Sequence, residues 1–338
     1  MRSYICQKVS EMIVPIIIFA ISFFITLVSI PPLIKYLKRV GLTVKDQNKK
    51  GRPLIPLSGG IAVAAGIFFG IMAYVFIRML IFHDQNLLLY FFAGMTTILL
   101  MTFIGFIDDS IIKKNKDASA GLRPWQKILM TLGAAVPLVA INAGETIVFL
   151  PFVGSVNLGL LYTLVIVPLM IVFFSNAVNI LAGFNGLETG LGLIYLGSLG
   201  LYAYANGGYV AATIALVTFA ALLAFIKFNW YPAKIFPGDS LTYLLGSVLA
   251  CIAILGNIEK AAMIVSIPFF IEFLLKARSG FKAQSFGYWK NGRVNSLYGD
   301  KIYSLTHLFT RTGKFSEKQI VIFLMLLELI FALLIWVI

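Results

Sequence analysis

Apolar runs of about 20 residues recur along this 338-residue chain and restrict the folds open to it. A helix of that length crosses the hydrocarbon core of a bilayer, which is about 30 Å thick. Charged residues make up only 12% of the chain, against about 25% in soluble domains, so a soluble surface cannot be covered. The sequence therefore predicts an all-α polytopic membrane protein, with residues 1–338 forming a single integral membrane domain.

Ten apolar runs predict about ten transmembrane helices, at 12–34, 59–81, 87–107, 124–142, 158–175, 187–205, 209–226, 240–256, 260–276 and 318–338. The one long non-apolar stretch is 277–317. Within it, Asn291-Gly292 is the strongest two-residue signal for a hairpin turn. We expect a small β-hairpin in this long loop.

The basic residues indicate the orientation of the chain. Of the 27 Lys and Arg residues, 23 fall in the loops after the first, third, seventh and ninth runs or at their helix ends. Short cytoplasmic loops carry such an excess. We expect both termini outside, a cytoplasmic 277–317 loop, and most of the acidic residues near the cytoplasmic face. The net charge of +13 is then a topology signal and suits an anionic substrate, not nucleic acid.

Two adjacent carboxylates, Asp108 and Asp109, end the run at 87–107 with no cation within three residues. Two like charges at the lipid boundary are costly unless a metal ion or a basic group neutralises them. The pair indicates either a site that handles metal and phosphate or a helix end exposed to water.

The segment 176–190 places three glycines, three asparagines and a glutamate between two apolar runs. Glycine lets the backbone approach a ligand closely, and asparagine offers both donors and acceptors. A turn that only connects two helices would not need Asn179, Asn185 and Glu188 together. The segment favours ligand binding.

A second loop, 228–240, contains two prolines and brings Asp239 to the start of the next run. An aspartate there either caps the helix or binds a metal ion. Lys127, just inside the fourth run, either points into a cavity or snorkels to the interface. A basic group at the end of the ninth run and in the loop after it neutralises either pyrophosphate oxygens or lipid head groups. Its members are Lys276, Arg278, Lys282, Lys290 and Arg293.

Taken together, these segments resemble the polyprenyl-phosphate N-acetylhexosamine-1-phosphate transferases, and among them the dolichyl-phosphate branch of eukaryotes and archaea. The resemblance is carried by DQNK (46–49), IPLSGG (55–60), Asp108-Asp109, NILAGFNGLE (179–188) and FNWYPAKIFPGD (228–239). The bacterial branches carry an H-x-H-H motif in the last cytoplasmic loop. This chain has only two histidines and cannot supply it.

The resemblance implies transfer of N-acetylglucosamine-1-phosphate from UDP-N-acetylglucosamine to a polyprenyl phosphate, with release of UMP. It implies an active site on the cytoplasmic face of a cell membrane or endoplasmic reticulum, and it admits a homodimer. The lipid-linked product would start a glycan, for N-glycosylation or for a surface glycan. The resemblance assigns catalytic roles to Asp108, Asp109 and Lys127, and the binding of Mg²⁺ (or Mn²⁺) to Asp239 and Asn179. It assigns substrate binding to Asn48, Lys49, Gly183, Asn185, Glu188, Phe236, Arg278 and Lys282.

A multi-span transporter is the alternative, since transporters also combine about ten spans with buried acids. Transporters place coupling carboxylates near the membrane midplane and often show inverted repeats. Here the acids gather near one face, only Glu328 sits deep in a run, and no repeat is visible. The pattern favours the transferase.

Overall fold

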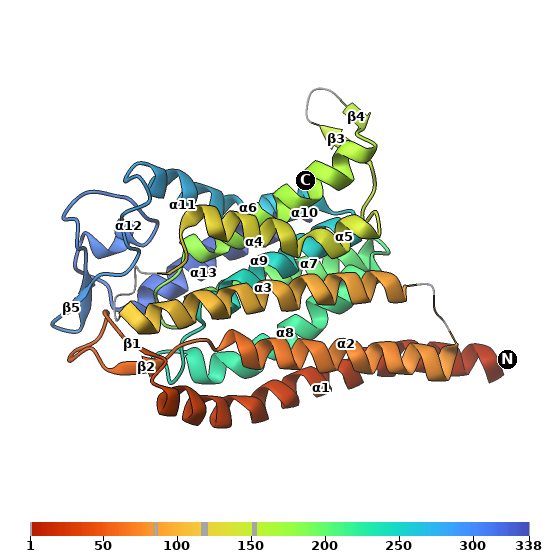
Figure 1. Ribbon diagram of the computed structural model, residues 1–338, viewed down its shortest axis with the longest axis horizontal. Coiled ribbons are helices and arrows are strands. Elements are labelled where there is room, and N and C mark those ends of the chain that lie inside the picture. The colour runs from red at the N-terminus through yellow and green to blue at the C-terminus, as the bar shows by residue number, and fades with distance from the viewer. Residues whose placement is uncertain (1, 84, 86, 116–120, 151–153, 338) are drawn as a thin grey trace.

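The structure is a computed structural model that describes residues 2–83, 85, 87–115, 121–150 and 154–337 (Figure 1). Its helices are α1 (Arg2–Val40), α2 (Gly60–Phe82), α3 (Leu88–Asn115), α4 (Pro124–Ala134), α5 (Val136–Ala140), η1 (Tyr162–Ile166), α6 (Val167–Ile180), α7 (Leu187–Ala205), α8 (Tyr209–Asn229), α9 (Gly238–Gly256), α10 (Glu259–Val265), α11 (Ile267–Ala277), α12 (His307–Thr310) and α13 (Glu317–Leu334).

Every predicted apolar run is helical. Two runs are each divided into two helices, at Ala135 and at Ser266, and the second helix then begins with Pro137 or Pro268 near its first position. A third run begins with the π-helical turn η1, which passes into α6. Proline is tolerated at a helix start because the first N–H groups have no partner within the helix.

Six helices of the described chain are long and apolar enough to cross a membrane: Ile13–Val40, Gly60–Phe82, Leu88–Ile111, Tyr162–Ile180, Tyr209–Asn229 and Gly238–Gly256. The helical membrane fold is therefore confirmed. The remaining runs form the divided pairs α4–α5 and α10–α11, the helix α7, and α13 with its internal Glu328. The count of ten spans stays a prediction.

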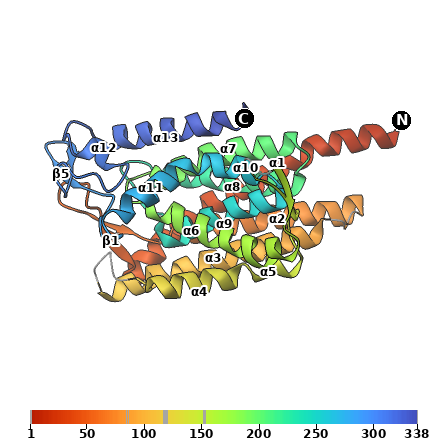
Figure 2. The same cartoon turned by 90° about the horizontal axis from the view of Figure 1, so that it is seen from above.

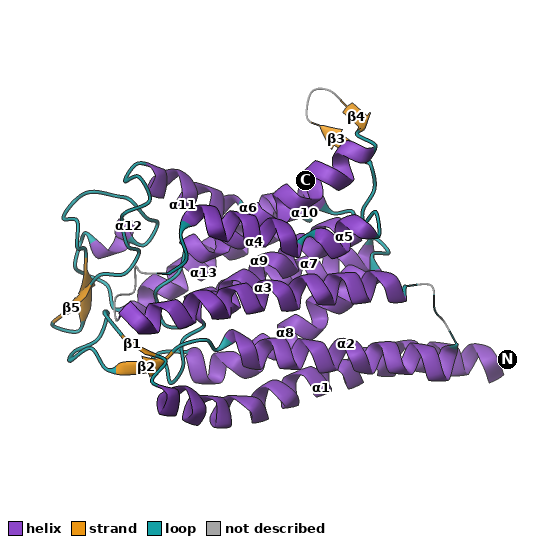
Figure 3. Cartoon of the chain, in the orientation of Figure 1, coloured by secondary structure: helices purple, strands orange, loops and turns teal. Residues whose placement is uncertain are grey.

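Among the described residues, three small antiparallel hairpins connect helices (Figure 3). The predicted one is confirmed: its strands flank Asn291 and Gly292, whose φ angles of 49° and 78° suit a tight hairpin turn. The other two hairpins were not predicted from the sequence. The strands are β1 (Thr43–Lys45) with β2 (Leu54–Pro56), β3 (Ile147–Leu150) with β4 (Gly154–Asn157), and β5 (Tyr288–Lys290) with β6 (Arg293–Asn295).

The helices run side by side along the molecule, and the β1–β2 and β5–β6 hairpins lie together at one end of it (Figures 1 and 2). We call this the β5 end. α13 starts there and runs toward the end where α1 begins. In the middle of the bundle, α9 packs against α2, α3, α6 and α8, and nearly all of its side chains are buried.

One glycine lets α3 and α9 approach closely near the β5 end. A Cβ on Gly105 would collide with the backbone of Asp239 and Ser240. Because Gly105 lies one helical turn before Asp108 and Asp109, this close approach brings the two carboxylates beside the first turn of α9. The fold thus joins two of the sequence segments that were predicted to carry chemistry.

Candidate active site

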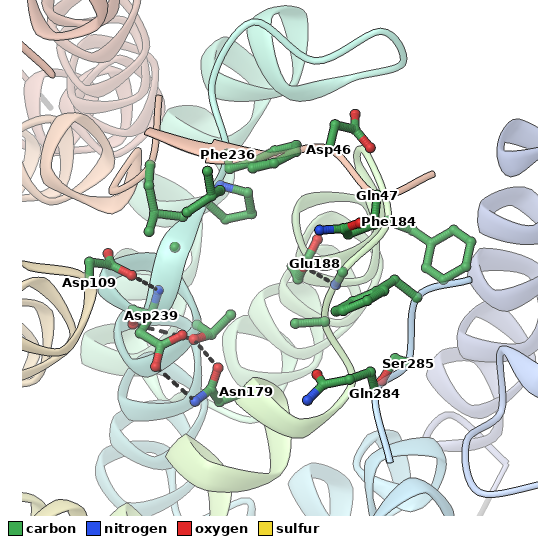
Figure 4. A pocket seen from close by; sticks show the side chains of 18 of the residues that line it. Asp46, Gln47, Asp109, Asn179, Phe184, Glu188, Phe236, Asp239, Gln284 and Ser285 are labelled. Atoms are coloured by element: carbon green, nitrogen blue, oxygen red, sulfur yellow. Dashed lines mark hydrogen bonds between the residues drawn. The ribbon is translucent and has the colours of Figure 1, made fainter. Parts of the chain in front are cut away.

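A cavity of about 910 Å³ lies at the β5 end, bounded by β1, the loop before α7, the start of α9 and residues 284–286 (Figure 4). Six of the predicted site residues line it: Asp109, Asn179, Gly183, Glu188, Phe236 and Asp239. The three sequence segments that were expected to form a site therefore meet in one chamber.

Asp239 faces the cavity from the first turn of α9 (Figure 4). Its Oδ2 is 3.3 Å from Nδ2 of Asn179 and 3.3 Å from Nζ of Lys127. The Asn179 Oδ1 accepts a hydrogen bond from Thr242 Oγ1 at 3.0 Å. The Asp239 carboxylate makes no cap on its own helix. Of the two alternatives from the sequence, the geometry therefore disfavours the helix cap.

Lys127 joins Asp108 to Asp239. Its ammonium forms an ion pair with Oδ2 of Asp108, which is fully buried, and reaches Asp239 as well. The Asp108 Oδ1 accepts the backbone N–H of Leu122. A cation between two carboxylates balances their charge in a site of low polarity. Lys127 thus points inward and does not snorkel.

Asp109 has a different environment from its neighbour, because consecutive residues of a helix point in different directions. Its Oδ1 accepts the Asp239 N–H at 2.8 Å, and its Oδ2 accepts the Ser58 hydroxyl at 2.6 Å and the Ser240 N–H at 3.2 Å. These N–H groups belong to the first turn of α9, where they have no partner within the helix. Asp109 therefore caps α9 and aligns Asp239 with the cavity.

The loop between α6 and α7 offers its backbone to the cavity, and the first turn of α7 offers a carboxylate. Gly183 has a φ of 121°, a conformation that disfavours any side chain, and its N–H donates to Oε1 of Glu188 at 2.8 Å. The Glu188 side chain is buried, and its Oε2 has no hydrogen-bond partner among the described residues. A buried acceptor without a partner is costly, so a donor from a bound ligand would stabilise it.

Asn48, Lys49 and Asn185 hold the site's loops together. Asn48 donates to the Gly183 carbonyl and accepts the Gly287 N–H, each at 3.0 Å. Lys49 pairs with Glu317 and, at 3.4 Å, with Asp46. Asn185 donates its backbone N–H to Glu317 and its side-chain amide to Asp46. None of these three residues lines the cavity, so the structure gives them a supporting position.

The remaining predicted residues separate into two groups. Phe236 lines the cavity and is fixed by backbone hydrogen bonds to Pro56 and Gly59. Arg278 and Lys282 are exposed and lie outside the cavity lining. The cation that reaches the wall there is Lys276, which is buried and donates to the Ala283 carbonyl at 2.6 Å. Its i,i+4 spacing from the buried Glu272 is the sequence signal that distinguishes it.

His307 supports the cavity wall at 284–286. Its Nδ1 accepts the Tyr303 N–H at 3.1 Å, so its Nε2 carries the proton and donates to the Gln284 carbonyl at 2.9 Å. The ring is therefore neutral. Burial lowers the pKa of His307 below its ordinary value, and nearby Lys276 acts in the same direction, whereas the bond to Gln284 opposes the shift.

This environment predicts a pH dependence. Because the folded-state pKa is lowered, the unfolded chain binds the proton more readily, and stability is lost as the pH falls below about 6.5. We expect His307→Gln to lose less stability than the wild type between pH 7.5 and 5.5. Acidification should lower the unfolding temperature of the wild type by on the order of 2 °C more than that of His307→Gln. Equal decreases in unfolding temperature for the two proteins would show that His307 does not cause the loss of stability in acid.

Comparison with known proteins places the chain in a family. The model of glycosyl transferase family 4 matches residues 91–257, the part that contains Asp108, Asn179 and Asp239. Fold and site together define a membrane-embedded transferase. The chain belongs to glycosyl transferase family 4, a conclusion that its similarity to an archaeal relative over nearly the full length establishes.

That relative, from Saccharolobus solfataricus, is 36% identical over 96% of both chains and carries the provisional name UDP-N-acetylglucosamine–dolichyl-phosphate N-acetylglucosaminephosphotransferase. A Dictyostelium discoideum protein with the same name, not marked as provisional, is 26% identical over 88% of this chain and 82% of its own. A phospho-N-acetylmuramoyl-pentapeptide-transferase from Lactobacillus acidophilus is 30% identical over 74% and 78%. The resemblance seen in the sequence motifs is confirmed, and these relatives favour the transferase over the transporter.

Proposed function

We propose that this protein transfers N-acetylglucosamine-1-phosphate from UDP-N-acetylglucosamine to a polyprenyl phosphate of the dolichyl type, releasing UMP. The observation that best supports this proposal is that one cavity is lined by Asp239 and Asn179 together with Gly183, Glu188 and Phe236. The Lys127–Asp108 ion pair lies beside Asp239. The names of the relatives support the substrates. The lipid-pyrophosphate-linked sugar would start glycan assembly.

The donor set fits a divalent cation of the Mg²⁺ type. Within the described residues, no group of three or more His, Cys, Asp or Glu side chains could hold a metal ion by itself. Mg²⁺ is commonly bound by one or two carboxylates together with substrate phosphates, and not by an all-protein cage. Asp239 would hold the ion, with Mn²⁺ as the alternative. The Asn179 amide oxygen would join it once the amide turns, because here the nitrogen faces Asp239 and the oxygen accepts the Thr242 hydroxyl. Once bound, the ion would neutralise the pyrophosphate oxygens.

The reaction exchanges one pyrophosphate for another. An oxygen of the lipid phosphate attacks the phosphorus bonded to the sugar, and the bond from that phosphorus to the oxygen shared with UMP breaks. UMP leaves with the electron pair. A phosphate monoester with a second pKa near 6 is mostly ionised at pH 7, so the attack needs little help from a base. Positioning and charge neutralisation carry the rate instead.

The residues that line the cavity, and the Lys127–Asp108 pair beside Asp239, then have separate roles. Lys127 balances charge that moves onto the leaving phosphate, and Asp108 holds that lysine in place. Gly183 and Phe236 bound the nucleotide side of the cavity, and the open Oε2 of Glu188 accepts a donor from the nucleotide or the sugar. Asp109 acts indirectly, because it accepts the backbone N–H of Asp239 and so holds that residue in position.

The orientation proposed here places the β5 end in the cytoplasm and both termini outside. We expect cysteines introduced at Lys234 and Asn291 to react with impermeant thiol reagents only from the cytoplasmic side, and one at Asn206 only from outside. All three positions are exposed, and the basis is the distribution of the basic residues. Labelling of position 291 from outside would contradict this topology.

The activity is tested by UMP release from purified protein supplied with UDP-N-acetylglucosamine and polyprenyl phosphate. Release should require the lipid, disappear in EDTA and return with Mg²⁺. UDP-N-acetylgalactosamine and UDP-glucose in parallel define the sugar. Release of UMP without polyprenyl phosphate would indicate a hydrolase and contradict the proposal.

A further inference from the structure

A second hollow, of about 420 Å³, adjoins the main cavity at the β5 end. It lies between the β1–β2 loop and the β5–β6 hairpin, and its walls include Lys45, Lys50, Arg52 and Trp289. Lys45 and Gln47 line both spaces. The two spaces therefore share a wall.

The two spaces differ sharply in charge. Four carboxylates and two lysines line the main cavity, whereas the described lining of the hollow contains four cations and no acid. One of these cations, Lys49, is held by Asp46 and Glu317. Within the described part of the chain, no carboxylate pairs with Lys45, Lys50 or Arg52, and all three are exposed. Their charge is available to an anion.

The hollow also has an aromatic wall. The Lys50 ammonium lies 6.0 Å from the centroid of the Trp289 ring, and Tyr288 also lines the hollow. A weak contact with a ring restrains the lysine without neutralising it. The β5–β6 hairpin lies at the extreme end of the molecule, beyond the ends of the helices (Figure 1). A soluble anion reaches this position more readily than a lipid head group.

We propose that this hollow is a second anion site, which binds the diphosphate group of a soluble nucleotide before or after it occupies the main cavity. Cations at the mouth of a cleft raise the local concentration of an anionic ligand and increase its rate of entry. The entry role rests on the proposed function, whereas the binding of a diphosphate does not.

Binding of radiolabelled inorganic pyrophosphate in EDTA favours the hollow, because the carboxylates of the main cavity outnumber its lysines and oppose this anion when no divalent cation is present. We expect saturable binding that weakens with salt and falls about tenfold or more in Lys50→Glu/Arg52→Glu, with a smaller fall in Lys50→Gln/Arg52→Gln. The matched control is Lys301→Glu/Arg311→Glu, which makes the same charge change at exposed positions outside the hollow.

Three outcomes would overturn the site: no binding in EDTA, equal losses in the two charge-reversed proteins, or loss of binding when phosphatidylglycerol replaces phosphatidylcholine in nanodiscs. The last outcome would assign the hollow to lipid head groups.

In the UMP assay, the Lys50/Arg52 variants should lower kcat/KM, leave kcat unchanged and flatten the dependence of kcat/KM on salt. Pyrophosphate binding without any UMP release would contradict the proposed function and leave the anion site standing.

Discussion

Replacing Asp239 by asparagine is expected to reduce sugar-phosphate transfer by about 10²- to 10³-fold while the protein stays folded. The side chain keeps its size but loses the charge that faces the cavity beside Asn179 and Lys127. The helix should remain intact, because the cap on α9 comes from Asp109 and not from Asp239 itself. Turnover per folded molecule and the unfolding temperature are the two measurements.

Higher Mg²⁺ should restore part of the Asp239→Asn activity, since a weakened metal site fills at higher ion concentration. The matched control is Glu328→Gln, which also converts a buried carboxyl group to an amide but lies within α13. It should turn over at near the wild-type rate. A marked fall in the unfolding temperature of Asp239→Asn, with normal turnover, would show that Asp239 acts only in the structure.

The two adjacent aspartates should respond differently to the same substitution. Asp108→Asn weakens the ion pair that holds Lys127, and we expect turnover to fall about 10²-fold with a modest effect on stability. Asp109→Asn replaces an acceptor of three hydrogen bonds by an amide and leaves at least one buried donor without a partner. It should lower the free energy of unfolding by about 1–3 kcal/mol.

Denaturant unfolding and single-turnover rates, measured on both variants, separate the two roles. Ser58→Ala provides a graded control, because it removes only one of the three donors to Asp109 and should destabilise the protein less. An Asp109→Asn protein as stable as the wild type, yet inactive, would make Asp109 a group that meets the reacting atoms.

The different environments of Asp108 and Asp109 show which features of the site can be predicted from the sequence and which cannot. Their position at the end of an apolar run predicted an unusual pair of carboxylates. Which of them meets Lys127, and which meets α9, depends on how α3 is rotated and on its contact at Gly105. Both are tertiary features that a linear pattern does not contain. Likewise, only the position of α3 shows that α9 is capped by Asp109 and not by Asp239.

Tertiary structure also decides which basic residues face the cavity. The family resemblance assigned Arg278 and Lys282 to substrate binding, but α11 ends at Ala277, and both residues lie outside the cavity. Lys276 faces inward because it shares a helical face with Glu272. The hairpin at Asn291-Gly292 was predictable because its turn signal is local. The strands β1 and β2 are three residues each, separated by residues 46–53, and no comparable signal marks them.

The most direct test of the account follows the phosphorus atom bonded to the sugar. UDP-N-acetylglucosamine labelled with ³²P at that phosphate is incubated with the purified protein, polyprenyl phosphate and Mg²⁺, and the lipid and aqueous products are separated. Transfer of the sugar phosphate predicts that the label enters the lipid product together with the sugar, while unlabelled UMP appears in equal amount. Labelled UDP in the aqueous phase, with the sugar alone on the lipid, would contradict the proposed reaction.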